Sequence, residues 1–190
     1  PEEALSRGVV CASAGNHAQG VAFSCRELAV RGCIFMPVTT PKQKIRQVQR
    51  FGGEFVEIVL AGDTFDDSAA AARAYCDEHG MAFIHPFDDP QVIAGQGTIG
   101  LEILDQLPDL DAVIVPVGGG GLISGVAFAI KSLRPEVKVY GVQAEGAPSM
   151  YRSLHEHKYQ TLKNVATFAD GIQVKTPGEL TYQLCEEYVD

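Results

Sequence analysis

Short apolar runs and longer amphipathic stretches alternate along most of the chain. The apolar runs are typical of buried strands, and stretches with apolar residues three or four positions apart are typical of helices. The predicted strands are residues 9–12, 33–37, 55–60, 82–85, 112–117 and 137–143. The predicted helices are residues 16–29, 41–51, 64–79, 90–107, 122–133, 149–157 and 179–188, and residues 160–176 form an irregular segment. Such alternation predicts an α/β protein with parallel sheets.

Residues with turn chemistry mark the ends of the predicted helices. Thr40 is expected to cap the helix that follows it, with Pro41 in the first helical position. Residue 63 or 64 is expected to open the next helix, which ends at residues 79–80. The acidic pairs at 66–67 and 88–89 are expected to act as caps or to interact with the helix dipole.

An acidic, proline-containing stretch at residues 87–90 is the candidate boundary between two lobes. Residues 1–88 are expected to form a smaller lobe and residues 89–190 part of a larger one, with further parts of the protein before and after them. The fold class predicted is therefore α/β, with two lobes of parallel or mixed sheet flanked by helices.

Composition narrows the classes of partner. The net charge of −9 disfavours nucleic acid or an anionic membrane as the partner, and 46% hydrophobic residues support a substantial core. The chain has 5 cysteines, an odd number, and no C-x-x-C spacing, so reduced thiols in a cytoplasmic protein are expected. No apolar run approaches about 18 residues, so no membrane span is expected.

A turn of small and polar residues follows the first predicted strand and opens a helix. It reads Ser13-Ala14-Gly15-Asn16-His17-Ala18-Gln19-Gly20. Such a turn leaves backbone N–H groups free at a helix N-terminus, where they attract an anion. Asn16 adds a side-chain amide beside them. The pattern predicts a site for a small carboxylate or phosphate, and the alternative is an ordinary turn between a strand and a helix.

A second turn, between predicted strand 112–117 and helix 122–133, consists of Gly118, Gly119, Gly120 and Gly121. Consecutive glycines let the backbone approach a ligand and turn several N–H groups the same way. A dinucleotide fingerprint fails, because Ile123 or Ser124 stands where its last glycine belongs, and a P-loop fails because no Gly-Lys-Ser/Thr follows. The alternative to a phosphate site is a glycine turn needed only for packing.

Together the two turns resemble those of the fold-type II pyridoxal-phosphate-dependent enzymes, which share the fold of the tryptophan synthase β chain. Within that group the chain is most similar to the threonine dehydratases, also called threonine ammonia-lyases. Further matching stretches lie at residues 65–66, 86–88, 92–98, 115–117 and 168–171. Sulfhydrylases and cystathionine synthases of the group usually carry Thr after the Asn, whereas this chain has His17.

The resemblance implies a role for each residue of the two turns. Asn16 would bind the phenolic oxygen of pyridoxal 5′-phosphate. The substrate carboxylate would be held around Ser13, Ala14, Gly15 and His17. The cofactor phosphate would be held by Gly118, Gly119, Gly120, Gly121 and Leu122.

The resemblance also implies an activity, the deamination of L-threonine to 2-oxobutanoate and ammonia in isoleucine biosynthesis. The implied partner is a small amino-acid substrate, and the full-length protein is expected to be a cytoplasmic homo-oligomer. Three alternatives remain: a serine dehydratase or racemase of the same fold, a non-catalytic ligand-binding relative, and a dinucleotide-binding domain, which the failed fingerprint disfavours.

Two departures from the family pattern stand out. The lysine that attaches the cofactor is expected upstream of Pro1, because no lysine here lies in a Phe/Tyr-Lys-x-Arg-Gly context, so the chain holds no catalytic residue of its own and is expected to be inactive alone. In the racemase branch, acidic residues near the strand at 137–142 bind a cation. Here Gln143 and Ser149 occupy those positions and Glu145 is out of register, so no metal site is expected.

Overall fold

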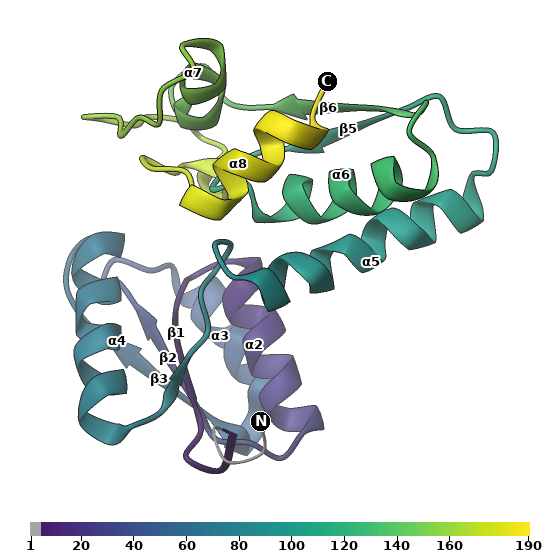
Figure 1. The fold of residues 1–190 in the computed structure, drawn as a ribbon. Coiled ribbons are helices and arrows are strands. Elements are labelled where there is room, and N and C mark those ends of the chain that lie inside the picture. The colour runs from purple at the N-terminus through teal and green to yellow at the C-terminus, as the bar shows by residue number, and fades with distance from the viewer. Residues whose placement is uncertain (1–4) are drawn as a thin grey trace. The chain divides into compact units, whose positions relative to one another are not determined.

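The computed structural model describes residues 5–190, drawn in Figure 1. The chain divides into two compact units, one ending at Pro86 and the other beginning at Phe87. The sequence placed its lobe boundary after Asp88. Phe87 and Asp88 belong with the second unit because Phe87 packs on the glycine turn and Asp88 binds the start of the last helix.

The first unit is built on a four-stranded parallel sheet with the order β3-β2-β1-β4. Its strands are β1 (Val9–Ala12), β2 (Gly32–Met36), β3 (Val56–Leu60) and β4 (Ala82–Phe83). The strand β4 ends two residues earlier than predicted, although the Ile84 N–H still donates to the Val10 carbonyl at 2.8 Å. The parallel sheet confirms the predicted fold class for this unit.

Helices cover both faces of this sheet (Figure 1). They are α2 (Asn16–Glu27), α3 (Lys42–Gly52) and α4 (Phe65–His79), with a 3-10 turn η1 (Gly53–Phe55). Alternate residues of β1 point to opposite sides, because side chains alternate along a strand. Val9 and Cys11 pack in the cluster with α2 and α3, whereas Val10 and Ala12 pack in the cluster with α4.

A capping box marks the start of α4, whereas α2 and α3 begin without a side-chain cap bond. The Thr64 side chain accepts the Asp67 N–H at 3.2 Å, and the Asp67 carboxylate accepts the Thr64 N–H at 3.0 Å, which completes a capping box. The predicted role of Thr40 is wrong. Pro41 is extended and stands at the cap position of α3, while Thr40 donates its N–H to the Pro37 carbonyl in the preceding turn.

The second unit carries a two-stranded parallel sheet of β5 (Ala112–Pro116) and β6 (Lys138–Val142). Its helices are α5 (Pro90–Gln106), α6 (Gly121–Leu133), α7 (Ser149–His155) and α8 (Glu179–Tyr188), with a 3-10 turn η2 (Asp170–Ile172). The core lies between β5, β6, α6 and α8, and includes Val115, Val126, Ile130, Val139 and Cys185.

All the cysteines are buried free thiols. Burial raises the pKa of Cys11 to about 12 and that of Cys185 to about 11, so these thiols are poor nucleophiles at neutral pH. Within residues 5–190, no helix is long and apolar enough to cross a bilayer.

Glycines allow α5 and α6 to pack closely side by side (Figure 1). A Cβ atom on Gly125 would lie 2.3 Å from the Ile93 carbonyl oxygen and 2.6 Å from the Gly97 nitrogen. Both contacts are with backbone, which cannot move aside as a flexible side chain can. The crossing therefore depends on the absence of a side chain at Gly125.

We expect Gly125→Ala to lower the free energy of unfolding by about 1–3 kcal/mol, because the added methyl group overpacks the α5–α6 crossing. Gly95→Ala is the matched control. A Cβ atom on Gly95, also in α5, meets nothing within 4 Å, so this variant is expected to be neutral or slightly stabilising. Urea denaturation of both variants checks the expectation, and equal stability of Gly125→Ala and wild type would contradict it.

Candidate functional site

The turn at residues 13–19 lies at the carboxyl end of β1 and leads into α2. The Ser13 N–H donates to the Phe35 carbonyl, and the Gly15 N–H donates to the Ser13 hydroxyl at 3.2 Å. The first bond of the helix runs from the Gln19 N–H to the Gly15 carbonyl. Among residues 5–190, no acceptor is bound by the N–H groups of Ala14, Asn16, His17 and Ala18. These donors form an anion-binding helix start.

Asn16 is exposed at the first position of α2, and its amide bonds no side chain or carbonyl of the described residues. Gly15 caps the helix without a side-chain bond, and a Cβ atom on Gly15 would meet nothing within 4 Å. Packing within this unit therefore does not require glycine at position 15.

His17 is partly buried and forms a hydrogen bond with the backbone just after β4. Its Nε2 atom lies 3.1 Å from the carbonyl oxygen of Ile84. A carbonyl can only accept, so Nε2 carries the hydrogen and Nδ1 keeps its lone pair. Burial lowers the pKa of His17, which the bond to Ile84 partly offsets and the charge of His85 reinforces. His17 is thus held as a neutral ring next to the turn.

The glycine turn at residues 118–121 links β5 to α6. Gly120 has a left-handed backbone with φ of 99°, and a Cβ atom there would lie 2.6 Å from Met150 and 2.7 Å from Thr181. A Cβ atom on Gly119 would lie 2.5 Å from the Phe87 ring, and one on Gly121 would lie 2.8 Å from its backbone. Packing therefore requires Gly119, Gly120 and Gly121. This agrees with the alternative in which the glycine turn is needed for packing.

The same turn leaves a run of amides unused. The first bond of α6 runs from the Ser124 N–H to the Gly120 carbonyl at 2.9 Å, while the Val117 N–H pairs with the Val142 carbonyl. Between them, within the described part of the chain, the N–H groups of residues 118–123 donate to no protein acceptor. A left-handed residue among successive amides makes a concave anion-binding nest. The turn therefore suits both tight packing and a phosphate.

Two polar side chains donate hydrogen bonds to backbone carbonyls at this turn. Gln143 donates from Nε2 to the carbonyls of Val117 at 3.1 Å and Gly118 at 3.4 Å, and its Oε1 accepts the Tyr151 N–H at 2.8 Å. Thr181 is fully buried and donates its hydroxyl to the Gly119 carbonyl at 2.6 Å. The sequence indicated neither role, because both contacts join residues far apart in the chain.

Asp88 holds the helix that carries Thr181. Its carboxylate accepts the N–H groups of Glu179 at 3.0 Å, Leu180 at 3.0 Å and Thr181 at 3.1 Å. The sequence predicts that the pair 88–89 caps the helix that follows it or interacts with its dipole. Only Asp89 does so, accepting from Gln91 and Val92, whereas Asp88 caps the distant α8.

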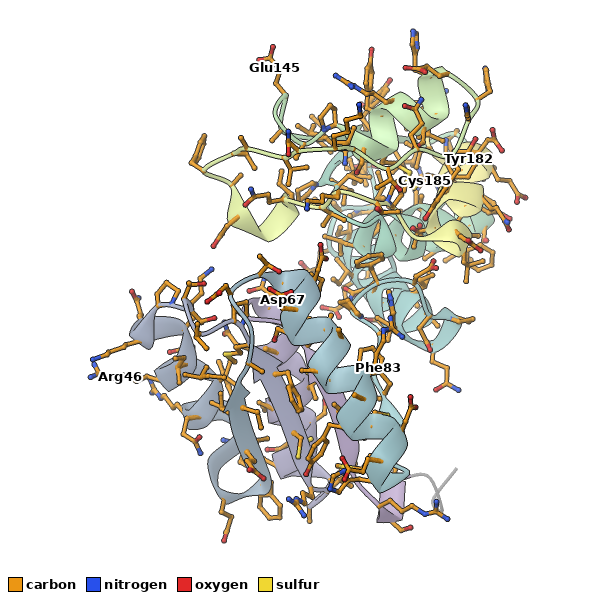
Figure 2. All side chains as sticks on the ribbon, turned by 90° about the vertical axis from the view of Figure 1, so that its left-hand side faces the viewer. Arg46, Asp67, Phe83, Glu145, Tyr182 and Cys185 are labelled. Atoms are coloured by element: carbon orange, nitrogen blue, oxygen red, sulfur yellow. The ribbon has the colours of Figure 1, made fainter. Side chains whose placement is uncertain are left out.

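The positions considered for a metal serve other purposes. Gln143 uses its amide on the glycine turn, and the Ser149 hydroxyl donates to the Val174 carbonyl at 3.0 Å. Glu145 projects from the surface (Figure 2). No cluster of three or more His, Cys, Asp or Glu side chains suited to a metal occurs among residues 5–190.

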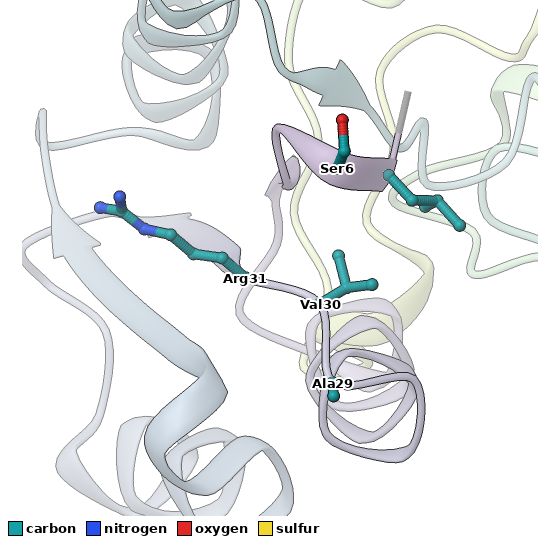
Figure 3. A pocket seen from close by; sticks show the side chains of 5 residues that line it. Ser6, Ala29, Val30 and Arg31 are labelled. Carbon is teal, nitrogen blue, oxygen red and sulfur yellow. The ribbon is translucent and has the colours of Figure 1, made fainter. Parts of the chain in front are cut away.

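The first unit has a surface hollow of about 460 Å³ (Figure 3). It is lined by Leu5, Ser6, Ala29, Val30 and Arg31, which precede the strands β1 and β2 and so lie at their amino ends. In open parallel sheets ligands bind at the carboxyl ends of the strands. We therefore do not assign this hollow to the candidate site.

Comparison with known proteins identifies the class. The chain belongs to the family of pyridoxal-phosphate dependent enzymes, whose model matches residues 2–190. Within it, the chain is 52% identical to the L-threonine ammonia-lyase of Thermotoga maritima over 189 residues, covering 100% of this chain and 46% of that protein. It is 51% identical to the biosynthetic L-threonine dehydratase IlvA of Halalkalibacterium halodurans, with the same coverage. The resemblance to threonine dehydratases is confirmed.

Solved structures agree with this family. Processed threonine deaminase isoform 2 of Solanum lycopersicum matches with a TM-score of 0.94 and 50% identity, over 100% of this chain and 52% of that one. Maize serine racemase matches with a TM-score of 0.94 and 35% identity, over 100% of this chain and 56% of that one. The chain thus spans about half the length of these relatives, and its predicted fold class is confirmed.

We expect stability to fall as the pH drops through the titration range of His17. The folded state lowers the pKa of His17 below its ordinary value of 6.5. The unfolded chain therefore binds the proton more tightly, and acidification stabilises it relative to the folded state. His17→Gln should flatten the change in unfolding free energy between about pH 7.5 and pH 5. The matched control is His155→Gln at an exposed position. A pKa of His17 above 6.5 by NMR titration would contradict the expectation.

We expect Asp88→Ala to lower the free energy of unfolding by about 1–3 kcal/mol, because three N–H groups of α8 lose a charged acceptor. Asp88→Asn should lose less, since Asn is also a good cap. Asp105→Ala, at an exposed position of α5, is the control. Urea denaturation measures all three variants, and equal loss for Asp88→Ala and Asp105→Ala would rule out the cap as a stabilising contact.

Proposed function

We propose that these residues belong to a pyridoxal-phosphate-dependent threonine ammonia-lyase, which converts L-threonine to 2-oxobutanoate and ammonia. The observation that carries the proposal is the pair of helix-start turns with unused amides, those of Ala14 and residues 16–18 and those of residues 118–123, in a chain of this family. Relatives named as threonine ammonia-lyase or dehydratase at 51–52% identity support the choice of substrate.

The residues present fit the cofactor. We propose that the phosphate binds the amides of Gly118, Gly119, Gly120, Gly121 and Leu122, where the left-handed Gly120 and the helix start both favour an anion. Buried backbone, not lysine or arginine, would supply the donors there. We further propose that the two units are parts of the smaller lobe, residues 1–88, and the larger lobe, residues 89–190.

The substrate end of the site is proposed to lie at the first turn. The turn of Ser13, Ala14, Gly15 and His17 would hold the substrate carboxylate through the unused N–H groups of Ala14 and His17 and the Ser13 hydroxyl, and so fix the orientation of the α-carbon. Asn16, whose amide bonds no described protein group, would donate to the phenolic oxygen of the cofactor. When bound, pyridoxal phosphate supplies the electron sink that allows the α-proton and the β-hydroxyl to leave.

The lysine that attaches the cofactor is expected elsewhere in the full-length protein. Two of the lysines here, Lys131 and Lys138, are paired with Asp190 at 2.6 and 2.7 Å. The remaining lysines lie outside the expected motif, at positions 42, 44, 158, 163 and 175. We therefore expect residues 1–190 alone to show no threonine elimination.

A second candidate function is a serine dehydratase or racemase. The maize serine racemase supports it, because that structure matches this chain as closely in backbone as the tomato enzyme does, at a TM-score of 0.94. The lower sequence identity, 35% against 50%, favours threonine ammonia-lyase.

We also propose a cytoplasmic, biosynthetic setting for the full-length protein. A role in isoleucine biosynthesis is supported by relatives named as biosynthetic. The net charge of −9 disfavours nucleic acid as a partner, and the free cysteines suit the cytoplasm. We also propose that the full-length protein is a homo-oligomer.

Assays of the full-length protein with added pyridoxal phosphate test the function. We expect 2-oxobutanoate from L-threonine with a kcat/KM above that for deamination or racemisation of L-serine. Asn16→Ala should lower kcat/KM for threonine by about tenfold to a hundredfold, because a donor to a charged oxygen is lost. Ser24→Ala, at an exposed position of the same helix, is the control.

Faster racemisation than deamination would favour the second candidate. Cofactor binding without turnover of either amino acid would favour a non-catalytic relative.

A further inference from the structure

Two side chains bind successive carbonyl groups at the glycine turn. Gln143 donates to the carbonyls of Val117 and Gly118, and Thr181 donates to the carbonyl of Gly119. The Gly119 carbonyl also accepts the Gly178 N–H at 3.1 Å. Three successive peptide groups of the turn are thus oriented through their oxygen atoms.

This orientation fixes where the amides point. A trans peptide group is planar, so its N–H points opposite to its C=O, and the described residues contain no cis peptide bond. Because the carbonyls of Val117, Gly118 and Gly119 point toward Gln143 or Thr181, the N–H groups of residues 118, 119 and 120 point away from these side chains. These are N–H groups that bond no described protein acceptor.

Both side chains are themselves fixed. The Tyr151 N–H can only donate, so the Gln143 atom it meets is the oxygen, and the NH2 group of Gln143 must face the turn. Thr181 is fully buried at the start of α8, where Asp88 accepts its N–H. The orientation of the turn therefore rests on contacts that do not depend on a ligand.

We propose that Gln143 and Thr181 are positioning residues, which aim the amides of Gly118, Gly119 and Gly120 at the phosphate of the cofactor. The proposal rests on the proposed function, since it takes the phosphate site as given. Neither side chain would touch the phosphate, and each acts through the peptide groups that it holds. The consequence is that these residues set the affinity for the phosphate group and not for the rest of the cofactor.

Binding of two ligands to the full-length protein without bound cofactor tests this. Pyridoxal 5′-phosphate and pyridoxal differ only in the phosphate, so the ratio of their dissociation constants isolates its contribution. We expect Gln143→Met and Thr181→Val each to weaken binding of pyridoxal phosphate roughly tenfold, the size of one charge-assisted bond from a backbone N–H group that is no longer aimed at the phosphate. Binding of pyridoxal should stay unchanged, as measured by absorbance titration.

Conservative variants and a control separate positioning from a general loss of structure. Thr181→Ser keeps the hydroxyl and should retain the wild-type ratio. Gln143→Glu keeps the shape of the side chain, but an ionised carboxylate cannot donate to a carbonyl. This variant should therefore lose the preference for pyridoxal phosphate over pyridoxal, as Gln143→Met does. Gln49→Met removes the same kind of bond, from Gln49 to the Gly53 carbonyl at 2.7 Å, in the first unit, and should change nothing.

The outcomes distinguish the two proposals. A wild-type ratio retained in the Gln143 and Thr181→Val variants, or an equal loss for both ligands, overturns the positioning role alone. No preference of the wild type for pyridoxal phosphate over pyridoxal overturns the phosphate site, and with it the proposed function. If Thr181→Val does not fold, as judged by its urea transition, the two Gln143 variants decide the matter.

Discussion

The carbonyl oxygen of Gly119 joins the glycine turn of the second unit to its last helix, α8. It accepts the Thr181 hydroxyl at 2.6 Å and the Gly178 N–H at 3.1 Å. Asp88 accepts the first N–H groups of the same helix, so the start of the unit, the glycine turn and α8 meet at one place. A side chain on Gly119 or Gly120 would displace Phe87 or Thr181 and open this contact.

Tight packing and a bound phosphate would both require residues without a side chain in the glycine turn. Its inner side has no room for a Cβ atom, and its carbonyls are bound by Gln143 and Thr181. With its packing and its carbonyls satisfied, the turn leaves the amides of residues 118–123 without an acceptor among residues 5–190. The packing alternative and the proposed phosphate site are therefore compatible with one arrangement of the turn. At Gly15 the case differs, because no neighbour restricts a side chain there.

Local patterns in the sequence determined most of the elements and both candidate turns. Alternating apolar runs predicted every strand to within two residues at either end, and the Thr64 capping box and the Asp89 cap are short-range contacts. Periodicity, caps and glycine runs can be read from neighbouring residues, since the physics behind them acts over one helical turn. Thr40 shows the limit, because the extended backbone of Pro41 moved the helix start by one residue.

Only the tertiary structure decided which residues support those turns. Asp88 reaches a helix 91–93 residues away, and Thr181 and Gln143 reach the glycine turn across 62 and 25–26 residues. No local pattern marks such contacts, because they form when separate elements pack. The sequence by itself therefore determined where an anion could bind and which family the motifs resemble. The fold decided how the binding groups are held, since buried carbonyls must find donors wherever packing places them.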